Sequence, residues 1–202
     1  MLEFISLPVL KDFLDVLSKA KELVGQIKSK KVRLFEDVID PTFRALQPVF
    51  EDYITLFATT LRDVSAARTT SEFNIALDNL RFSRAKLFST RAEIRALTAE
   101  TMSLSHDRDL YRFLRCVDSI FYNVRMAPQQ SKMSRSLEVQ GLLELLAEDD
   151  DNISREFAET CIRKTLREVE NGFIDAAQAH ARIRIESQIH LIATFKTTSD
   201  AQ

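Results

Sequence analysis

The sequence predicts an all-α fold, an antiparallel bundle of five to seven helices, several of them long. Two observations carry this prediction. The 202 residues include only 3 glycines and 4 prolines, far fewer than the tight turns of a sheet protein need. Apolar residues, 45% of the chain, recur at seven-residue spacing, which keeps a heptad-like seam of each helix facing a neighbour. We expect one domain, residues 1–202, with a boundary at 127–134 only if the chain holds two subdomains.

The first two helices are expected to begin near Pro8 and at Pro41, because proline is favoured in a first turn, where its missing N–H would lack a partner anyway. Pro48 lies inside the second helix, where it removes a backbone hydrogen bond and predicts a kink. For residues 30–39 the sequence does not decide between a separate short helix and a continuation of the first helix. The apolar seam of the first helix comprises Leu10, Leu17 and Val24, and that of the second comprises Phe43, Phe50, Phe57 and Val64.

A third helix is expected from Thr69 through Arg95, and a fourth after Ser105. Thr69 and its neighbours supply an N-cap, with Glu72 well placed in the first turn, and Ser105 supplies the next cap. The third seam comprises Phe73, Leu80, Leu87 and Ile94, and the fourth Leu110, Val117 and Val124.

The rest of the chain predicts a short helix near 136–147 and a long final one. For residues 182–195 the sequence allows either helix or strand. Ile183 and Ile185 would lie on one face of a strand but on opposite sides of a helix. We prefer helix, because a lone strand has no partner elsewhere in this chain. The final seam comprises Ile162, Leu166, Val169, Phe173 and Ala176.

Charge and cysteine content narrow the class of protein. The 28 Lys and Arg against 30 Asp and Glu give a net charge of −2, which argues against bulk nucleic-acid binding. No apolar run is long enough to span a membrane, and the N-terminus lacks the basic start and cleavage site of a signal peptide. Cys116 and Cys161 lie far apart in sequence and read as small packing residues. A reducing, cytoplasmic compartment fits best.

Four arginines fall within an arc of about 80° when the third helix is drawn at 100° per residue. Such a basic stripe can bind a partner protein through an acidic helix, or bind phosphates. The more ordinary interpretation is structural: the arginines flank the seam, pair with Asp or Glu of a neighbouring helix and cover apolar surface. The four are Arg81, Arg84, Arg91 and Arg95.

The chain has 3 histidines, none at the spacing of a metal-ligand set. We interpret His180 and His190 as parts of a hydrogen-bonded polar layer that fixes the register of the last helix. The stretch from Arg184 to His190 also resembles the motif of HEPN-type ribonucleases, in which four to six residues separate Arg from His. That resemblance implies a helical dimer in which Arg184 and His190 face across the dimer, together holding the phosphate and assisting attack by the 2′-hydroxyl. It covers seven residues, and Ile185 stands where the family usually has a polar residue.

No glycine-rich phosphate loop or nucleophile elbow occurs. The leading hypothesis is therefore a non-enzymatic cytoplasmic interaction or scaffolding module, without cofactor or metal, that presents helix faces to itself or to a partner protein. The HEPN-like ribonuclease is the second hypothesis. The third is a peripheral membrane bundle acting through residues 1–33, whose apolar start precedes a basic run that can contact anionic lipid.

Overall fold

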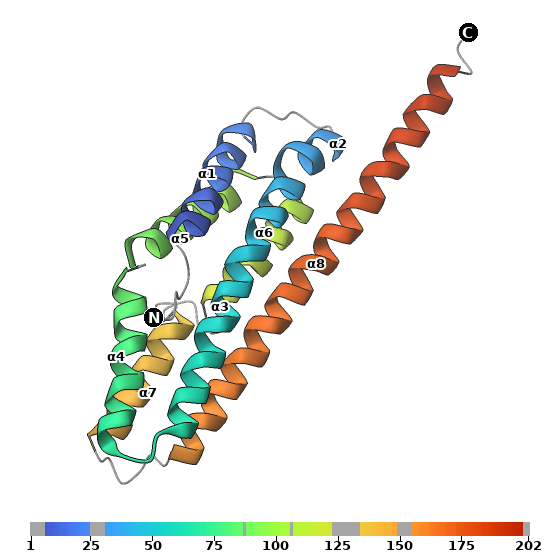
Figure 1. Ribbon diagram of the computed structural model, residues 1–202. Coiled ribbons are helices and arrows are strands. Elements are labelled where there is room, and N and C mark those ends of the chain that lie inside the picture. Colours follow the sequence, from blue (N-terminus) through green and yellow to red (C-terminus); the bar gives the residue numbers. More distant parts are fainter. Residues whose placement is uncertain are drawn as a thin grey trace.

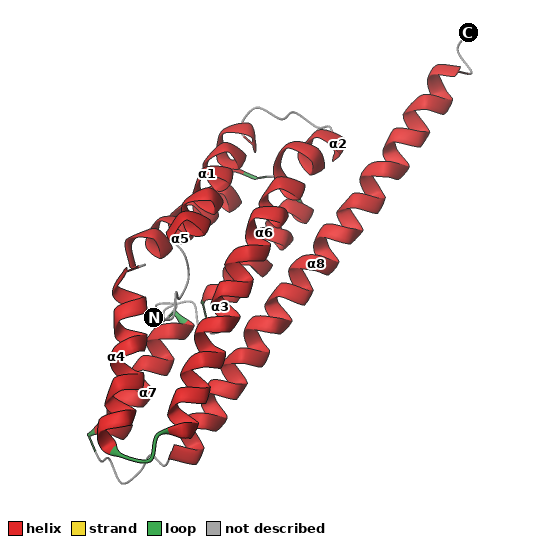
Figure 2. Ribbon diagram, in the orientation of Figure 1, coloured by secondary structure: helices red, strands yellow, loops and turns green. Residues whose placement is uncertain are grey.

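The computed structural model describes residues 7–24, 31–86, 88–105, 107–122, 134–148 and 155–199; for Leu7, Lys86 and residues 190–199 it describes the backbone alone. These residues hold no strand beyond a single bridge between Tyr122 and Ser134 (Figure 2). The predicted all-α bundle is confirmed. Its elements are α1 (Leu7–Val24), α2 (Lys31–Leu34), the π-helical turn η1 (Phe35–Ile39), α3 (Asp40–Ala66), α4 (Thr70–Lys86), α5 (Phe88–Leu104), α6 (Arg108–Phe121), α7 (Arg135–Ala147) and α8 (Arg155–Ser199).

Helix α8 forms one side of the bundle and packs on α3 and α6 (Figure 1). In this view α8 rises while α3 and α6 descend, so both pairs are antiparallel. Helices α4 and α7 form another antiparallel pair, whereas α1 and α5 pack together and run in the same direction. The C-terminal end of α8 extends beyond the other helices.

The core is made from one face of each helix. In α6 the buried residues recur every three or four positions, the period of a single helix face. Phe13 of α1, Phe57 of α3 and Phe113 of α6 are fully buried, and Phe43 and Phe50 are half-buried against them. Because isolated helices of these lengths are marginal in water, the contacts between them supply most of the stability.

Residues 31–39 are helical and continue directly into α3. Their connection to α1 lies outside the described residues. The backbone N–H of Asp40 donates to the carbonyl of Phe35, five residues back, in a widened turn. Pro41 follows at once. Its ring crowds the carbonyl four residues earlier and it has no N–H, so a wider turn ahead of it relieves the clash. Pro48 lies inside α3, and the kink there stays a prediction.

The stretch expected as one third helix is two helices. Helix α4 ends at Lys86, α5 begins at Phe88, and the two point in different directions (Figure 1). Helix α4 packs on α7 and α5 packs on α1, so one straight helix could not contact both neighbours. No glycine or proline marks the change of direction. The single-helix prediction was wrong, and the arginine stripe is divided between α4 and α5.

The caps of α4 and α6 differ in how well they were predicted. Thr69 Oγ1 accepts the N–H of Glu72 at 3.2 Å, and Glu72 Oε2 accepts the N–H of Thr69 at 3.1 Å, a reciprocal capping box. The cap expected at Ser105 is wrong, because Asp107 is the N-cap of α6. Its Oδ1 accepts the N–H of Asp109 at 2.8 Å and of the next residue at 2.9 Å. A carboxylate satisfies two helix-start donors more strongly than one hydroxyl does.

Helix α7 matches the short helix expected near 136–147, and Ser134 is its N-cap. The rest of the expected loop 127–134 lies outside the described residues. Helix α8 is helical throughout 155–199, including 182–195. A Cβ added at Gly172 would lie 3.0 Å from Ser119 Oγ of α6, so this glycine allows α8 to approach α6 closely.

His180 joins α8 to α3. Its Nε2 lies 2.9 Å from Asp40 Oδ1, and its ring stacks on Phe43 with centroids 4.3 Å apart. This confirms the interhelical hydrogen bond expected of His180. The side chain of His190 lies outside the described residues.

Candidate functional site

Arg84 and Arg91 converge on α7 although they belong to different helices. Arg84 Nε donates to Ser136 Oγ at 3.3 Å, and Arg91 Nη1 donates to the same oxygen at 2.9 Å. Arg84 Nη1 also donates to Gln140 Oε1. The turn between α4 and α5 thus brings together two guanidinium groups that were expected to lie seven residues apart on one helix.

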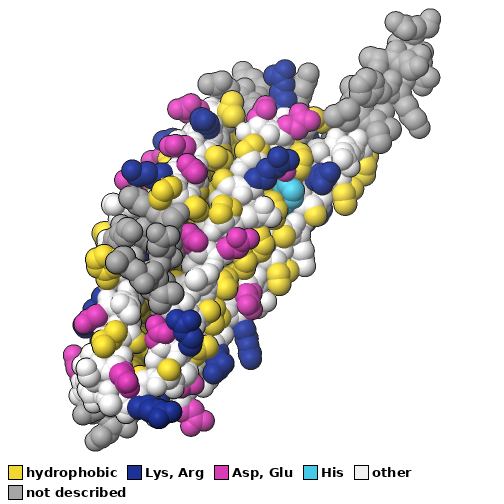
Figure 3. All heavy atoms as spheres, viewed as in Figure 1, with side chains coloured by type: hydrophobic (Ala, Val, Ile, Leu, Met, Phe, Trp, Pro, Cys, Tyr) yellow, Lys and Arg dark blue, Asp and Glu magenta, His cyan; other side chains and the backbone are white. Residues whose placement is uncertain are grey.

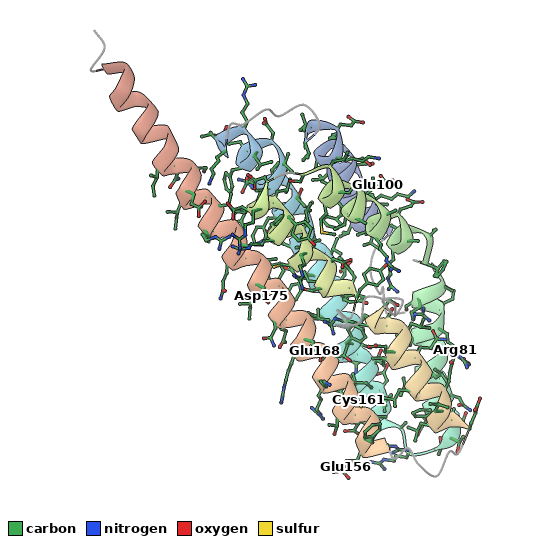
Figure 4. All side chains as sticks on the ribbon, turned by 180° about the vertical axis from the view of Figure 1, so that it is seen from behind. Arg81, Glu100, Glu156, Cys161, Glu168 and Asp175 are labelled. Carbon is green, nitrogen blue, oxygen red and sulfur yellow. The ribbon has the colours of Figure 1, made fainter. Side chains whose placement is uncertain are left out.

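The partners of Arg84 and Arg91 are neutral, whereas those of Arg81 are acidic. Arg81 Nε donates to Glu144 Oε1 of α7 at 3.0 Å and its Nη1 donates to Asp78 Oδ1 at 3.2 Å, and these hydrogen bonds raise the pKa of Arg81. Figure 4 labels Arg81 on α4, beside α7. Among the described residues no carboxylate forms an ion pair with Arg84 or Arg91. Burial, followed by repulsion from Arg91, lowers the pKa of Arg84.

Arg91 is only 7% exposed, and its buried Nη2 has no hydrogen-bond partner among the residues that the structure describes. Its guanidinium lies over the ring of Tyr53, 5.5 Å from the centroid. The hydroxyl of Tyr53 is a second buried polar atom without a partner. A buried donor that bonds neither protein nor water costs about 1–3 kcal/mol, and a charged one costs more. Such a group calls for an explanation beyond packing.

A groove of about 580 Å³ opens over these arginines. Arg95 lies 5.0 Å from the ring centroid of Tyr122, whose hydroxyl donates to the carbonyl of Arg91 at 3.1 Å. Burial raises the pKa of Tyr122, and the nearby arginines act against that rise. Among the described residues that line the groove, none is acidic. It is lined by Arg84, Phe88, Arg91, Ala92, Arg95, Ala96, Ala99, Tyr122, Ser134 and Leu137.

The edge of the groove is apolar and open to solvent. Phe88 is 69% exposed and Leu137 is 40% exposed, although side chains of this kind are usually covered. Sequence patterns identified the arginines, but they did not identify Phe88, Leu137 or Ser136, because α7 reaches this place only through the tertiary fold. We define the arginine groove as this cavity, with Arg84, Arg91 and Tyr122 at its inner side and Phe88, Arg95 and Leu137 at its edge.

The described residues give no structural support to the other candidate sites. Arg184 lies on an exposed part of α8, and because the His190 side chain is outside the described residues, the HEPN-like pair stays a prediction. In the described part of the chain no three His, Cys, Asp or Glu side chains lie close enough to hold a metal. Cys116 and Cys161 are free thiols, both half-buried.

The membrane hypothesis rests largely on residues outside the described ranges, since 1–6 and 25–30 are not described. Of the described helices, none has the length and apolarity to cross a bilayer. The apolar face of α1, with Leu10, Phe13 and Leu17, is buried in the bundle. Lys31 donates to Glu186 of α8 at 3.2 Å. Figure 3 shows basic and acidic side chains interspersed on the visible face, with hydrophobic ones reaching the surface along α8.

Comparison with protein-family models, with curated protein sequences and with solved structures gave no match.

Proposed function

We propose that this chain is a non-enzymatic, cytoplasmic interaction module that binds an acidic segment of a partner protein in the arginine groove. The observation that carries the proposal is that Arg84 and Arg91 donate to the neutral Ser136 and Gln140, next to an opening whose described lining residues include no acid. Positive charge in a partly buried site is costly to the fold unless negative charge lies near it, and Glu144 offsets only part of that cost at Arg84, whose pKa is still lowered by burial and by Arg91. A partner carboxylate entering the groove would supply the missing negative charge.

The edge of the groove supports a protein partner over a free ion. Phe88 and Leu137 present exposed apolar surface in the same groove as the arginines. Aromatic and arginine side chains are enriched among the residues that contribute most to protein interfaces. An acidic segment carrying an apolar residue would cover Phe88 or Leu137 while its carboxylate meets Arg95.

Photo-crosslinking from position 88 tests this proposal. A photoreactive phenylalanine replaces Phe88, the protein is irradiated in cells, and the crosslinked segments are identified by mass spectrometry. Phe82 is a matched control, since it is 72% exposed, lies six residues earlier and does not line the groove. We expect position 88 to capture segments rich in Asp and Glu, and Arg95→Glu to abolish that capture.

The same experiment can contradict the proposal. If segments captured from position 88 are no more acidic than those captured from position 82, or if Arg95→Glu leaves capture unchanged, the groove does not bind an acidic partner. Arg81→Ala serves as the charge control, because Arg81 is already paired with Asp78 and Glu144.

Contact between two copies of the chain is a second candidate, and α8 favours it. Ile174, Ile185 and Ile189 are all exposed and fall within about 60° of one another around the helix. An exposed apolar row of this kind is typical of a helix-face contact. Sedimentation equilibrium tests it: Ile185→Glu lowers the apparent mass at high concentration if copies pair here. Phe157→Glu, on another side of α8, should not. Equal masses for wild type and Ile185→Glu exclude this contact.

A further inference from the structure

The arginine groove as a whole holds more positive charge than one carboxylate would neutralise. Arg84, Arg91 and Arg95 all line it, and none of the three forms an ion pair with a described carboxylate. Among the described residues, the Arg91 guanidinium contacts Ser136 Oγ and the Tyr53 ring, and the Arg95 guanidinium contacts the Tyr122 ring. Three fixed positive charges therefore face one opening.

We propose that the groove recognises a phosphate group on a phosphorylated side chain of the partner protein. This inference rests on the proposed function, because it names the acidic group that the module binds. A phosphomonoester carries about −1.5 to −2 charges at pH 7 and three acceptor oxygens, whereas a carboxylate carries one charge and two oxygens. Clusters of arginine bind phosphate through paired N–H groups at fixed angles, a geometry that lysine does not offer.

The unpartnered Arg91 Nη2 marks the inner end of this site. The atom is shielded from solvent and belongs to a residue that lines the groove, so a phosphate oxygen reaches it only after a small shift of the guanidinium. Its own Nη1 is held by Ser136 Oγ at 2.9 Å, and its guanidinium rests on the Tyr53 ring. These contacts hold Arg91 in place before a ligand arrives, which lowers the cost of ordering it on binding.

The surroundings favour a single phosphate on a peptide over a nucleic-acid backbone. A strand of RNA needs a basic track along several phosphates. Here the neighbouring surface of α5 carries Glu93 and Glu100, which line a separate groove against α1, and the net charge of the chain is −2. Phe88 and Leu137 at the edge suit apolar residues on either side of a phosphorylated one.

Nuclear magnetic resonance of the arginine side-chain N–H groups tests the inference directly. Three five-residue peptides serve as probes, identical except for a central phosphoserine, glutamate or serine between leucines. A uridine oligonucleotide is the fourth probe. We expect the phosphoserine peptide to shift the signals of Arg84, Arg91 and Arg95 and to bind about tenfold more tightly than the glutamate peptide.

Variants separate recognition from charge alone. Arg91→Lys keeps the charge but loses the planar guanidinium, and we expect it to weaken phosphoserine binding about tenfold while weakening glutamate binding less. Arg81→Ala should leave both affinities within about twofold, because the carboxylates of Asp78 and Glu144 already pair with Arg81. Amide spectra of each variant show whether the fold is kept.

Each other outcome overturns the phosphate inference, the acidic-partner proposal, or both. Equal affinity for the phosphoserine and glutamate peptides overturns the phosphate inference but leaves the acidic partner standing. Shifts in none of the three arginines with either peptide overturn both. Tighter binding of the oligonucleotide than of the phosphoserine peptide overturns the peptide ligand in favour of RNA.

Discussion

Arg91 is a buried charged side chain that two neighbouring residues hold in place. Its guanidinium is buried, held by one serine and one aromatic ring, and left with an unpartnered Nη2. Arg135 lies in a comparable position at the start of α7 but pairs with Glu168 and donates to the Ser119 carbonyl at 3.0 Å. The contrast between two buried arginines explains why we place the binding site at Arg91.

The two described helical glycines give a prediction at the residue scale. Gly141 has nothing within 4 Å of an added Cβ, whereas a Cβ at Gly172 would lie 3.0 Å from Ser119 Oγ and 3.2 Å from Ile120 Cγ1. Alanine is favoured over glycine in a helix by about 1 kcal/mol. We expect Gly141→Ala to raise the Tm by about 2–4 °C and Gly172→Ala to raise it less or to lower it. Thermal unfolding by circular dichroism measures both. An equal gain at the two positions would show that α8 and α6 are not in close contact there.

At the scale of the element, the start of α4 depends on charge. The backbone N–H of Arg68, and next that of Thr69, donate to Glu72 and lower its pKa. Because the folded-state pKa is below the unfolded one, the Glu72 carboxylate stabilises the fold above the unfolded pKa, and that contribution is lost as pH falls through the folded pKa. The pKa of Glu144 is lowered too, first by Gln140 and then by Arg81.

We expect Glu72→Gln to lower the urea midpoint at pH 7 and to change it less at about pH 3, where a larger fraction of the wild-type carboxyl is protonated. Glutamine still accepts the capping hydrogen bonds, so the variant isolates the charge. Urea unfolding at the two pH values provides the measurement. A difference between wild type and variant that is the same at both pH values would mean that the charge of Glu72 does not contribute.

Most of the elements could be predicted from the sequence because their causes are local. The capping box at Thr69 and Glu72 and the apolar face of α6 need only neighbouring residues. The break between Lys86 and Phe88 could not be predicted, since its cause is the separate packing of α4 on α7 and of α5 on α1. For the same reason the arginines were identified as a stripe, while the groove that Ser136 and Leu137 complete was not.

At the scale of the whole molecule, stability depends on the shared core. Phe57 is fully buried, whereas Phe82 is 72% exposed. We expect Phe57→Ala to cost about 3–5 kcal/mol, a large part of a typical total, and so to lower the Tm by about 6 °C or more. Phe82→Ala should change the Tm by less than about 2 °C. Thermal unfolding of both variants makes the comparison. A loss below about 2 °C for Phe57→Ala would contradict the buried position of α3.

The bundle also has to tolerate the charge in its arginine groove, and this links stability to binding. A ligand that binds only the folded state stabilises it in proportion to the logarithm of its concentration above Kd. Burying an ionised group without a counter-charge costs free energy, and an apolar side chain of similar length avoids that cost. Arg91→Met should therefore unfold no more easily than wild type, yet lose its response to phosphate.

Urea unfolding of wild type and Arg91→Met, in phosphate and in chloride at equal ionic strength, tests this central claim most directly. We expect phosphate to raise the wild-type midpoint more than the Arg91→Met midpoint, with the variant at least as stable as wild type in chloride. If Arg91→Met loses several kcal/mol in chloride, Arg91 supports the fold. If the variant gains as much from phosphate as wild type does, Arg91 binds no anion. Either result contradicts the account.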